Sequence, residues 1–166
     1  MNTKIFIGII AGIVLVTFSI GCVEEESNNG DLSISNIVFC SEQPVGYMDY
    51  DEQPSAQYNP GDTVWIYMNI NNLYYNSNSD ESSEIWIKQN LTLLDSQGEL
   101  IYDFGEIVND HRNIPEEEDP DKIFLTNNIN IPTDFDPGRY TVQILVKDAL
   151  AGETTSESST FRIIIG

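Results

Sequence analysis

The segment TVWIYMNI, residues 63–70, decides the fold class, because apolar and more polar side chains alternate along its length. Successive side chains of a β-strand point to opposite faces, so this period of two predicts a strand with one buried face. The side chains on that face are Val64, Ile66, Met68 and Ile70. The segment RYTVQILV, residues 139–146, repeats the pattern. Its expected inward side chains are Tyr140, Val142, Ile144 and Val146. The two segments together predict an all-β domain.

Five more segments have this strand-like character, and turn-rich stretches separate them. They are LSISNIVFC (32–40), IWIKQNLTLL (85–94), ELIYDF (99–104), KIFLTNNINI (122–131) and SSTFRIII (158–165). In the turn DSQG (95–98) the glycine can take the positive φ that a hairpin needs. The polar stretches 109–121 and 147–157 are expected to be loops. About seven strands joined by short returns predict a single Ig-like antiparallel β-sandwich.

Residues 1–21 are similar to the signal peptide of a lipoprotein, and we expect them to form a signal or anchor helix. Lys4 supplies the positive start, and residues 5–20 are one apolar run. As a helix that run would rise about 24 Å, which is shorter than the roughly 30 Å hydrocarbon core of a bilayer. Gly21-Cys22 resembles the lipobox, in which a small residue precedes the cysteine that becomes lipid-modified and N-terminal. The two preceding residues, Ser and Ile, depart from the usual lipobox pattern.

Two alternatives to lipidation of Cys22 stay open at this point. One is a retained N-terminal anchor helix, and the other is ordinary cleavage that leaves Cys22 free or in a disulfide. Residues 22–31 contain three consecutive Glu followed by Ser, Asn and Gly. Like charges extend such a segment, so it is expected to be an acidic tether for the domain at 32–166. The expected location is the extracytoplasmic face of the cell membrane, with a lipid anchor.

The charge balance excludes several classes of function. The 166 residues include 27 acidic and 7 basic side chains, which gives a formal net charge of −20. Nucleic-acid binding needs a cationic patch that displaces counterions from phosphates, so it is not expected here. One His and two Cys provide too few ligands for a structural zinc site. No cofactor is expected.

Three motifs in the domain are similar in order and spacing to those of Ig-like, macroglobulin-like or fibronectin-like domains of prokaryotic cell-surface proteins. They are Tyr58-Asn-Pro-Gly-Asp-Thr-Val64, Leu94-Asp-Ser-Gln-Gly98 and Pro137-Gly-Arg-Tyr-Thr-Val142. The resemblance covers residues 32–166 and implies a β-sandwich. Such domains mostly act as spacers, adhesion modules or parts of larger assemblies, so the resemblance implies a binding or structural role.

The sequence gives little sign of catalysis. The single imidazole, His111, lies in a polar stretch that we expect to be an exposed loop. A Ser or Cys nucleophile would need this His as its base, and no nucleophile-elbow motif is present. We therefore predict that the chain is not an enzyme.

Two weaker candidate sites involve oxygen ligands and modification. The acidic run at 116–121 could bind Ca²⁺ weakly through carboxylate oxygens, although its spacing does not match an EF-hand. Its candidate ligands are Glu116, Glu118, Asp119 and Asp121. Asn90-Leu91-Thr92 matches the N-glycosylation pattern, within an expected strand.

Five aromatic residues are candidates for contact with a partner or a glycan. They are Trp65, Tyr67, Tyr74, Tyr75 and Trp86. The two Trp alternate against inward residues of different expected sheets, so they would lie on opposite outer faces and could not share one ligand. Either each packs beneath a long loop such as 41–62 or 71–84, or one face is a partner interface.

The sequence thus predicts a membrane-anchored extracytoplasmic lipoprotein with a binding or structural module that contacts other cell-envelope proteins. The alternative is a surface module that binds a glycan or Ca²⁺. Cys40, at the end of the first expected strand, is expected to be a small buried side chain. An intermolecular disulfide through Cys40 is the alternative.

Overall fold

The structure, a computed structural model, describes residues 30–165. The expected signal or anchor helix, Cys22 and most of the acidic tether lie outside these residues. The described part is all-β, as predicted. No helix within residues 30–165 is long and apolar enough to span a membrane.

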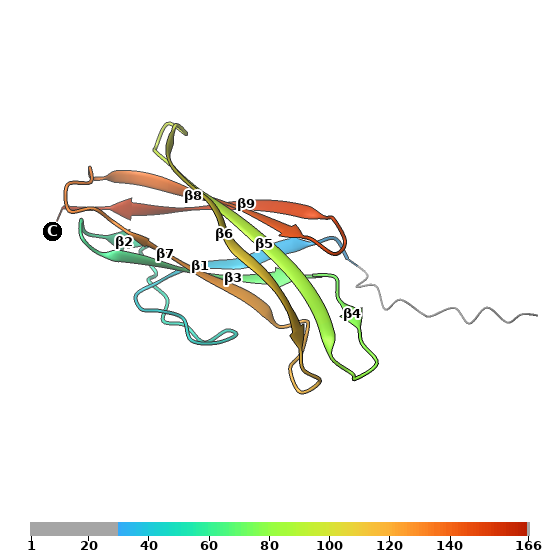
Figure 1. Cartoon of the computed structure of the whole chain (residues 1–166). Coiled ribbons are helices and arrows are strands. Elements are labelled where there is room, and N and C mark those ends of the chain that lie inside the picture. The colour runs from blue at the N-terminus through green and yellow to red at the C-terminus, as the bar shows by residue number, and fades with distance from the viewer. Residues whose placement is uncertain (1–29, 166) are drawn as a thin grey trace, which may run out of the picture.

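Nine strands follow one another along the described chain (Figure 1). They are β1 (Ser33–Cys40), β2 (Gln57–Tyr58), β3 (Thr63–Asn71), β4 (Asn76–Ser77), β5 (Ser83–Leu94), β6 (Leu100–Ile114), β7 (Ile123–Asn130), β8 (Gly138–Asp148) and β9 (Thr154–Ile163). Seven of them correspond to the seven predicted segments, and the other two, β2 and β4, have two residues each.

The strands form two sheets. The smaller sheet has the order β1-β3-β7, and the larger has the order β2-β9-β8-β5-β4 with β6 paired to β5. Neighbouring strands are antiparallel, except that β2 runs parallel to β9. The strand β7 is therefore one edge of the smaller sheet, and β6 is one edge of the larger.

The core lies between the sheets and is built from the predicted alternating positions. In β3 the four expected inward residues are almost fully buried, as are the four in β8. In β5 the inward row includes one polar residue, Gln89, which is fully buried. Gln89 Nε2 donates to Asn127 Oδ1 of β7 at 2.8 Å, and Asn127 Nδ2 donates back to Gln89 Oε1 at 3.1 Å. This reciprocal amide pair satisfies both side chains and links the two sheets.

Two predicted loops are wrong in part because strand pairing overrides their polar composition. The strand β6 continues through residues 109–114, paired with β5 as far as Ile114, which is buried. The strands β8 and β9 extend through most of 147–157 and leave only 149–153 as a hairpin. A long partner strand supplies backbone hydrogen bonds to polar residues that would otherwise be solvated. Ile165, the last residue of the predicted strand segment 158–165, lies beyond β9 and is exposed.

The predicted turn at Gly98 and the inward position of Tyr140 are confirmed. Gly98 has a φ of 85°, and its N–H donates to the Asp95 carbonyl at 3.1 Å. Tyr140 packs its ring against Phe161, with 5.9 Å between ring centroids. Its hydroxyl donates to the carbonyl of Asp136 at 2.6 Å, so the loop before β8 is fixed to the core.

The strand order gives the domain two distinct ends. The strand β1 begins at one end, together with the 149–153 hairpin and the loop between β6 and β7. The opposite end carries the 95–99 hairpin, the loop between β7 and β8, and the end of β9 (Figure 1). We call these the entry end and the far end.

Candidate functional site

At the far end of the domain, the smaller sheet does not cover the core-facing side of β6. Tyr102 of β6 pairs with Leu93 of β5, so both side chains lie on the core-facing side of the larger sheet. Leu93 is buried, whereas Tyr102 is 58% exposed. The smaller sheet ends at β7, and no further strand of the described chain lies beyond it to cover β6. The core-facing side of β6 is therefore open to solvent at this point.

Between this open face and β7 lies a groove of about 320 Å³. We call it the β6–β7 groove. Its lining residues are Leu93, Ile101, Tyr102, Phe104, Asn128, Ile129, Asn130, Ile131, Pro132, Phe135 and Phe161. None of them is charged, and most are apolar. Its volume lies within the range of pockets that bind small molecules or a few side chains.

Aromatic contacts hold the walls of the groove in place. On the β6 side, the Tyr102 and Phe104 rings lie 4.6 Å apart between centroids. On the other side, Phe135 contacts Tyr140, with 5.0 Å between ring centroids. Since Tyr140 is itself fixed to Phe161 and to the loop backbone, this wall is held by the core. Contacts within the domain therefore hold both walls of the groove.

Acidic side chains occur along both chain segments that form the groove. Residues 93–111 and 123–138 contain seven Asp or Glu and no Lys or Arg. Two of the seven, Glu106 and Asp110, have basic partners in Lys88 and Arg112. The ion pairs of the described residues do not reach the other five, which are Asp95, Glu99, Asp103, Asp134 and Asp136. Of these, Asp103 lies on the outer face of the larger sheet beside Asn90 and Thr92, away from the groove. The groove is apolar, with uncompensated negative charge in the segments that flank it.

The rest of β6 is protected in the way that exposed sheet edges usually are. The register with β5 shifts at three places, and Gly105 has a φ of 68°. Beyond Gly105 the strand carries Glu106, Asp110 and Arg112. Bulges and charges discourage the pairing of another strand with an edge. The start of β6 lacks this protection, because Leu100, Ile101 and Tyr102 are all exposed apolar residues.

The outer face of the smaller sheet is covered by the segment between β1 and β2. Tyr67 of β3 is fully buried there, with its ring against Tyr50 at 4.5 Å and against Phe124 at 5.7 Å between centroids. The backbone N–H of Met48 donates to the Tyr67 hydroxyl at 2.9 Å. Burial raises the pKa of this phenol. Tyr67 is therefore a structural residue and not a surface contact, which corrects its place among the candidate aromatics.

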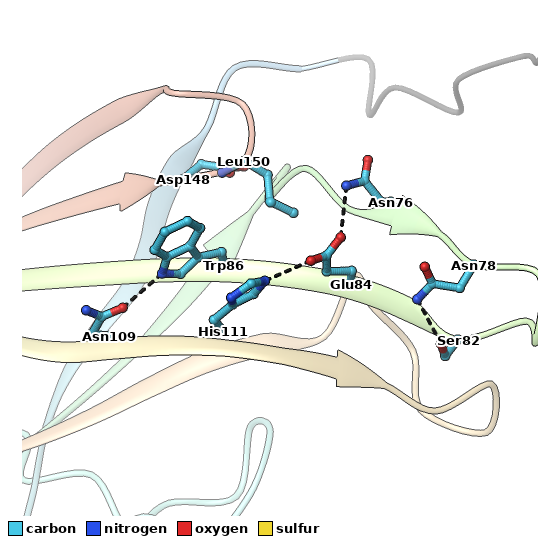
Figure 2. Close-up of polar contacts among 9 residues, drawn as sticks. All are labelled: Asn76, Asn78, Ser82, Glu84, Trp86, Asn109, His111, Asp148 and Leu150. Carbon is cyan, nitrogen blue, oxygen red and sulfur yellow. Dashed lines mark hydrogen bonds and ion pairs between the residues drawn. The ribbon is translucent and has the colours of Figure 1, made fainter.

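Trp86 lies on the outer face of the larger sheet, in β5 (Figure 2). Trp86 stacks on His111 of β6, with 4.8 Å between ring centroids. The Trp86 indole N–H donates to Asn109 Oδ1 at 2.9 Å, and His111 Nε2 lies 2.8 Å from Glu84 Oε1. The hydrogen bond with His111 holds the pKa of Glu84 below its usual value. His111 is exposed as expected, but it lies in a strand and not in a loop.

The five candidate aromatics therefore do not form one platform. Trp65 and Trp86 lie in different sheets, as predicted. Tyr74 and Tyr75 follow β3 at the entry end, where Tyr75 packs against the core. The Tyr74 N–H donates to the carboxylate of Asp148 at 2.6 Å, which also accepts from the N–H groups of Leu150 and Ala151. Asp148 is fully buried and fixes the hairpin after β8 to the segment after β3.

The four candidate Ca²⁺ ligands lie in the loop between β6 and β7 and are not gathered into one group in the structure. They are Glu116, Glu118, Asp119 and Asp121. Asp119 pairs with Lys122 at 3.0 Å and also accepts the Asp121 N–H, which together hold the pKa of its carboxyl below its usual value. Within residues 30–165 no group of three or more His, Cys, Asp or Glu side chains is arranged to hold a metal ion.

Asn90 and Cys40 take the positions that their segments predict. Asn90 lies in β5 and lines a shallow hollow of about 300 Å³ on the outer face of the larger sheet. Cys40 is a free, fully buried thiol at the end of β1. Burial and the nearby carboxylates of Glu52 and Asp51 raise its pKa to about 11. A buried thiol of this kind does not favour the intermolecular disulfide.

The β6–β7 groove was not among the sites predicted from the sequence. The segment ELIYDF, residues 99–104, carries the signal in its three consecutive apolar residues 100–102. At most two of the three can face the core in a regular strand, so at least one indicates an irregular or exposed surface. The position of β7, which leaves them uncovered, is a property of the tertiary structure.

No family model matches the sequence, and no curated protein matches it either. Among solved structures, the chain is similar to a family 123 glycoside hydrolase from Clostridium perfringens, described in work on glycolipid glycan hydrolysis. The identity is 18% and the TM-score is 0.40. The match covers 65% of this chain, which spans only 22% of the length of that structure.

This finding runs against the prediction that the chain is not an enzyme. The similar structure is a hydrolase, so that prediction is corrected and is not carried further. The likeness is to a small part of a larger protein, at a TM-score of 0.40, and it shows no hydrolase activity for this chain.

Proposed function

We propose that the chain is an extracytoplasmic protein held at a membrane by lipid on Cys22, with an Ig-like module that binds a neighbouring cell-envelope protein in the β6–β7 groove. One observation carries the binding proposal: an apolar groove lies beside exposed apolar residues of an edge strand. Exposed apolar surface of this kind is the usual mark of an interaction site.

The strand arrangement supports the Ig-like part of the proposal. Without β2 and β4, seven strands remain, and the first, second and fifth form one sheet. The third, sixth and seventh belong to the other, which is the division between the two sheets of an Ig sandwich. The Tyr140 hydroxyl bonds the backbone four residues upstream at the start of β8, as in the tyrosine corner of that fold. Here the fourth strand, β6, lies in the larger sheet.

The position of the groove suits a membrane-anchored protein. The groove is lined by residues from the far end of the domain, whereas β1 begins at the entry end. The nine residues 23–31 between Cys22 and the domain reach at most about 30 Å when extended. With lipid on Cys22, the entry end would face the membrane and the groove would face away from it. A partner could then reach the groove from the envelope.

Crosslinking of intact native cells tests this proposal. The protein is captured after crosslinking, and mass spectrometry identifies both the attached proteins and the N-terminal peptide. We expect a lipid-modified Cys22 and one dominant envelope protein. The Tyr102→Ser variant, which lacks an exposed apolar wall of the groove, should no longer capture that envelope protein. The matched control is Leu145→Ser, which removes a 42% exposed apolar residue from another strand of the same sheet.

Two results would contradict the proposal. An unmodified N-terminus would contradict the lipid anchor. Capture that is unaffected by Tyr102→Ser, or equally reduced by Leu145→Ser, would contradict the groove as the binding site. Circular dichroism of both purified variants controls for loss of fold.

A further inference from the structure

The β6–β7 groove has the form of a missing strand. In the smaller sheet β7 pairs with β3 along one side, from Ile123 to Asn130, and with no strand of the described chain along its other side. Above that free side, β6 presents Tyr102 and Phe104 across the groove. A fourth strand beside β7 would pair with its backbone and would bury its own side chains against these two rings.

We propose that the groove binds an extended segment of the partner, which adds to the smaller sheet as a fourth strand beside β7. This inference rests on the proposed function, since it specifies how the partner binds. An edge strand offers unpaired N–H and C=O groups, and pairing with them is a recurring mode of peptide recognition. The groove then selects side chains at alternate positions of the added strand, because only these point towards β6.

The flanking charges define the chemistry of the segment. The groove lining is uncharged, so the side chains that enter it must be apolar. Glu99 on the β6 side and Asp134 and Asp136 on the β7 side have no basic partner among the described ion pairs. The segment that fits is therefore an apolar alternating strand with Lys or Arg near its ends.

The same charges argue against the two other occupants. A second copy of this chain would bring its own net charge of −20 and the same acidic flanks to the interface. Like charges placed together at an interface are unfavourable. The N-terminal part of this chain enters the domain at Leu32, at the end opposite to the groove. A cationic partner segment matches the charge and the position of the groove.

Binding of a designed peptide to the full chain in detergent tests the inference. The probe is Lys-Lys-Val-Thr-Ile-Thr-Val-Thr-Ile-Lys-Lys with a fluorescent label, and its matched control has Glu in place of Lys. We expect the lysine peptide to bind and the glutamate peptide to bind at least about tenfold more weakly. Glu99→Gln combined with Asp134→Asn should weaken binding of the lysine peptide several-fold. Glu157→Gln, in an exposed position of β9, should leave it unchanged.

Methylation of the peptide backbone tests strand addition itself. In an added strand only alternate N–H groups face β7. Methylation of one alternate set of peptide nitrogens should weaken binding about tenfold or more, and methylation of the other set should have little effect. Equal effects of the two sets would overturn strand addition. Tyr102→Ser should also weaken binding, whereas Leu145→Ser should not.

The outcomes separate this inference from the proposed function. If capture in cells depends on Tyr102 but neither peptide binds, the groove is a binding site and strand addition is wrong. If neither capture nor peptide binding depends on Tyr102, both proposals are wrong. If sedimentation shows a dimer of the full chain that Tyr102→Ser dissociates, the occupant is a second copy and the cationic partner segment is wrong.

Discussion

Tyr67 and Tyr102 are both strand tyrosines that contact other aromatic rings, and they meet opposite environments. Tyr67 lies on the outer face of the smaller sheet, and Tyr102 lies on the core-facing side of the larger sheet. The segment between β1 and β2 covers Tyr67 completely and satisfies its hydroxyl. No segment within residues 30–165 covers Tyr102, which is 58% exposed. The comparison shows that a long loop covers the outer face of the smaller sheet at Tyr67, whereas the core-facing side of the larger sheet stays open at Tyr102.

The closed face should be costly to disturb. Tyr67→Ala removes a fully buried ring and its hydrogen bonds. Replacement of a buried aromatic by alanine costs about 3–5 kcal/mol of unfolding free energy. Tyr102→Ala should cost less than about 1 kcal/mol, because exposed substitutions have small effects. Chemical denaturation of the two variants measures the difference. Equal losses would contradict the contrast between the two faces.

The amide pair between the sheets should give the next largest effect. Gln89→Ala leaves the Asn127 amide without its partner inside the core, where an unsatisfied polar group costs about 1–3 kcal/mol. Asn127→Ala should cost a similar amount by leaving the Gln89 amide with only the Met68 sulfur as a hydrogen-bond partner. The double variant should cost less than the sum of the two, since both single changes break the same pair. A double-mutant cycle by denaturation measures this coupling, and strict additivity would contradict it.

Cys40 makes the closed face sensitive to alkaline pH. Its thiol has a folded pKa of about 11 against an ordinary value of 9.0, so the folded state keeps the proton more tightly. This contribution to stability is full below pH 9.0 and is lost progressively as pH rises towards 11. By pH 10 the loss should be on the order of 1 kcal/mol. Cys40→Ala should flatten the fall in stability between pH 8 and 10 in parallel denaturation curves. An equal fall in unfolding free energy with pH in the wild type and in Cys40→Ala would contradict this role of Cys40.

Glu84 should give the smallest effect, on the exposed face of the larger sheet. Its pKa is held below the ordinary value of 4.5 by the hydrogen bond with His111. The contribution of Glu84 is therefore present above pH 4.5 and is lost as pH falls through its lower folded pKa. Thermal melts from pH 3 to 6 should show a slightly shallower acid dependence in Glu84→Gln than in the wild type. An acid dependence in Glu84→Gln that equals that of the wild type would contradict this contribution.

The sequence predicts the closed parts of the molecule well. The alternation in residues 63–70 and 139–146 identifies the buried face of β3 and β8, because strand side chains must alternate. The turn at Gly98 and the fixed ring of Tyr140 also follow from local residue chemistry. Tyr67 sits in that alternating segment, but its burial depends on a cover from another part of the chain.

The open parts could not be predicted in the same way. The polar composition of residues 109–114 indicates a loop, and only the pairing with β5 makes them a strand. The groove depends on where β7 ends the smaller sheet, which no local pattern records. In the acidic run at 116–121, closeness in sequence does not gather the carboxylates into one group in the structure, because the arrangement of a loop depends on its surroundings.

A photoreactive side chain in place of Tyr102 tests the central claim most directly. The variant is expressed in native cells, with the same side chain in place of Leu145 as the control, and the crosslinked peptides are sequenced. The account predicts one adduct from position 102, on an extended apolar segment with basic residues in an envelope protein, and none from position 145. Equal crosslinking at both positions, or none at position 102, would contradict it.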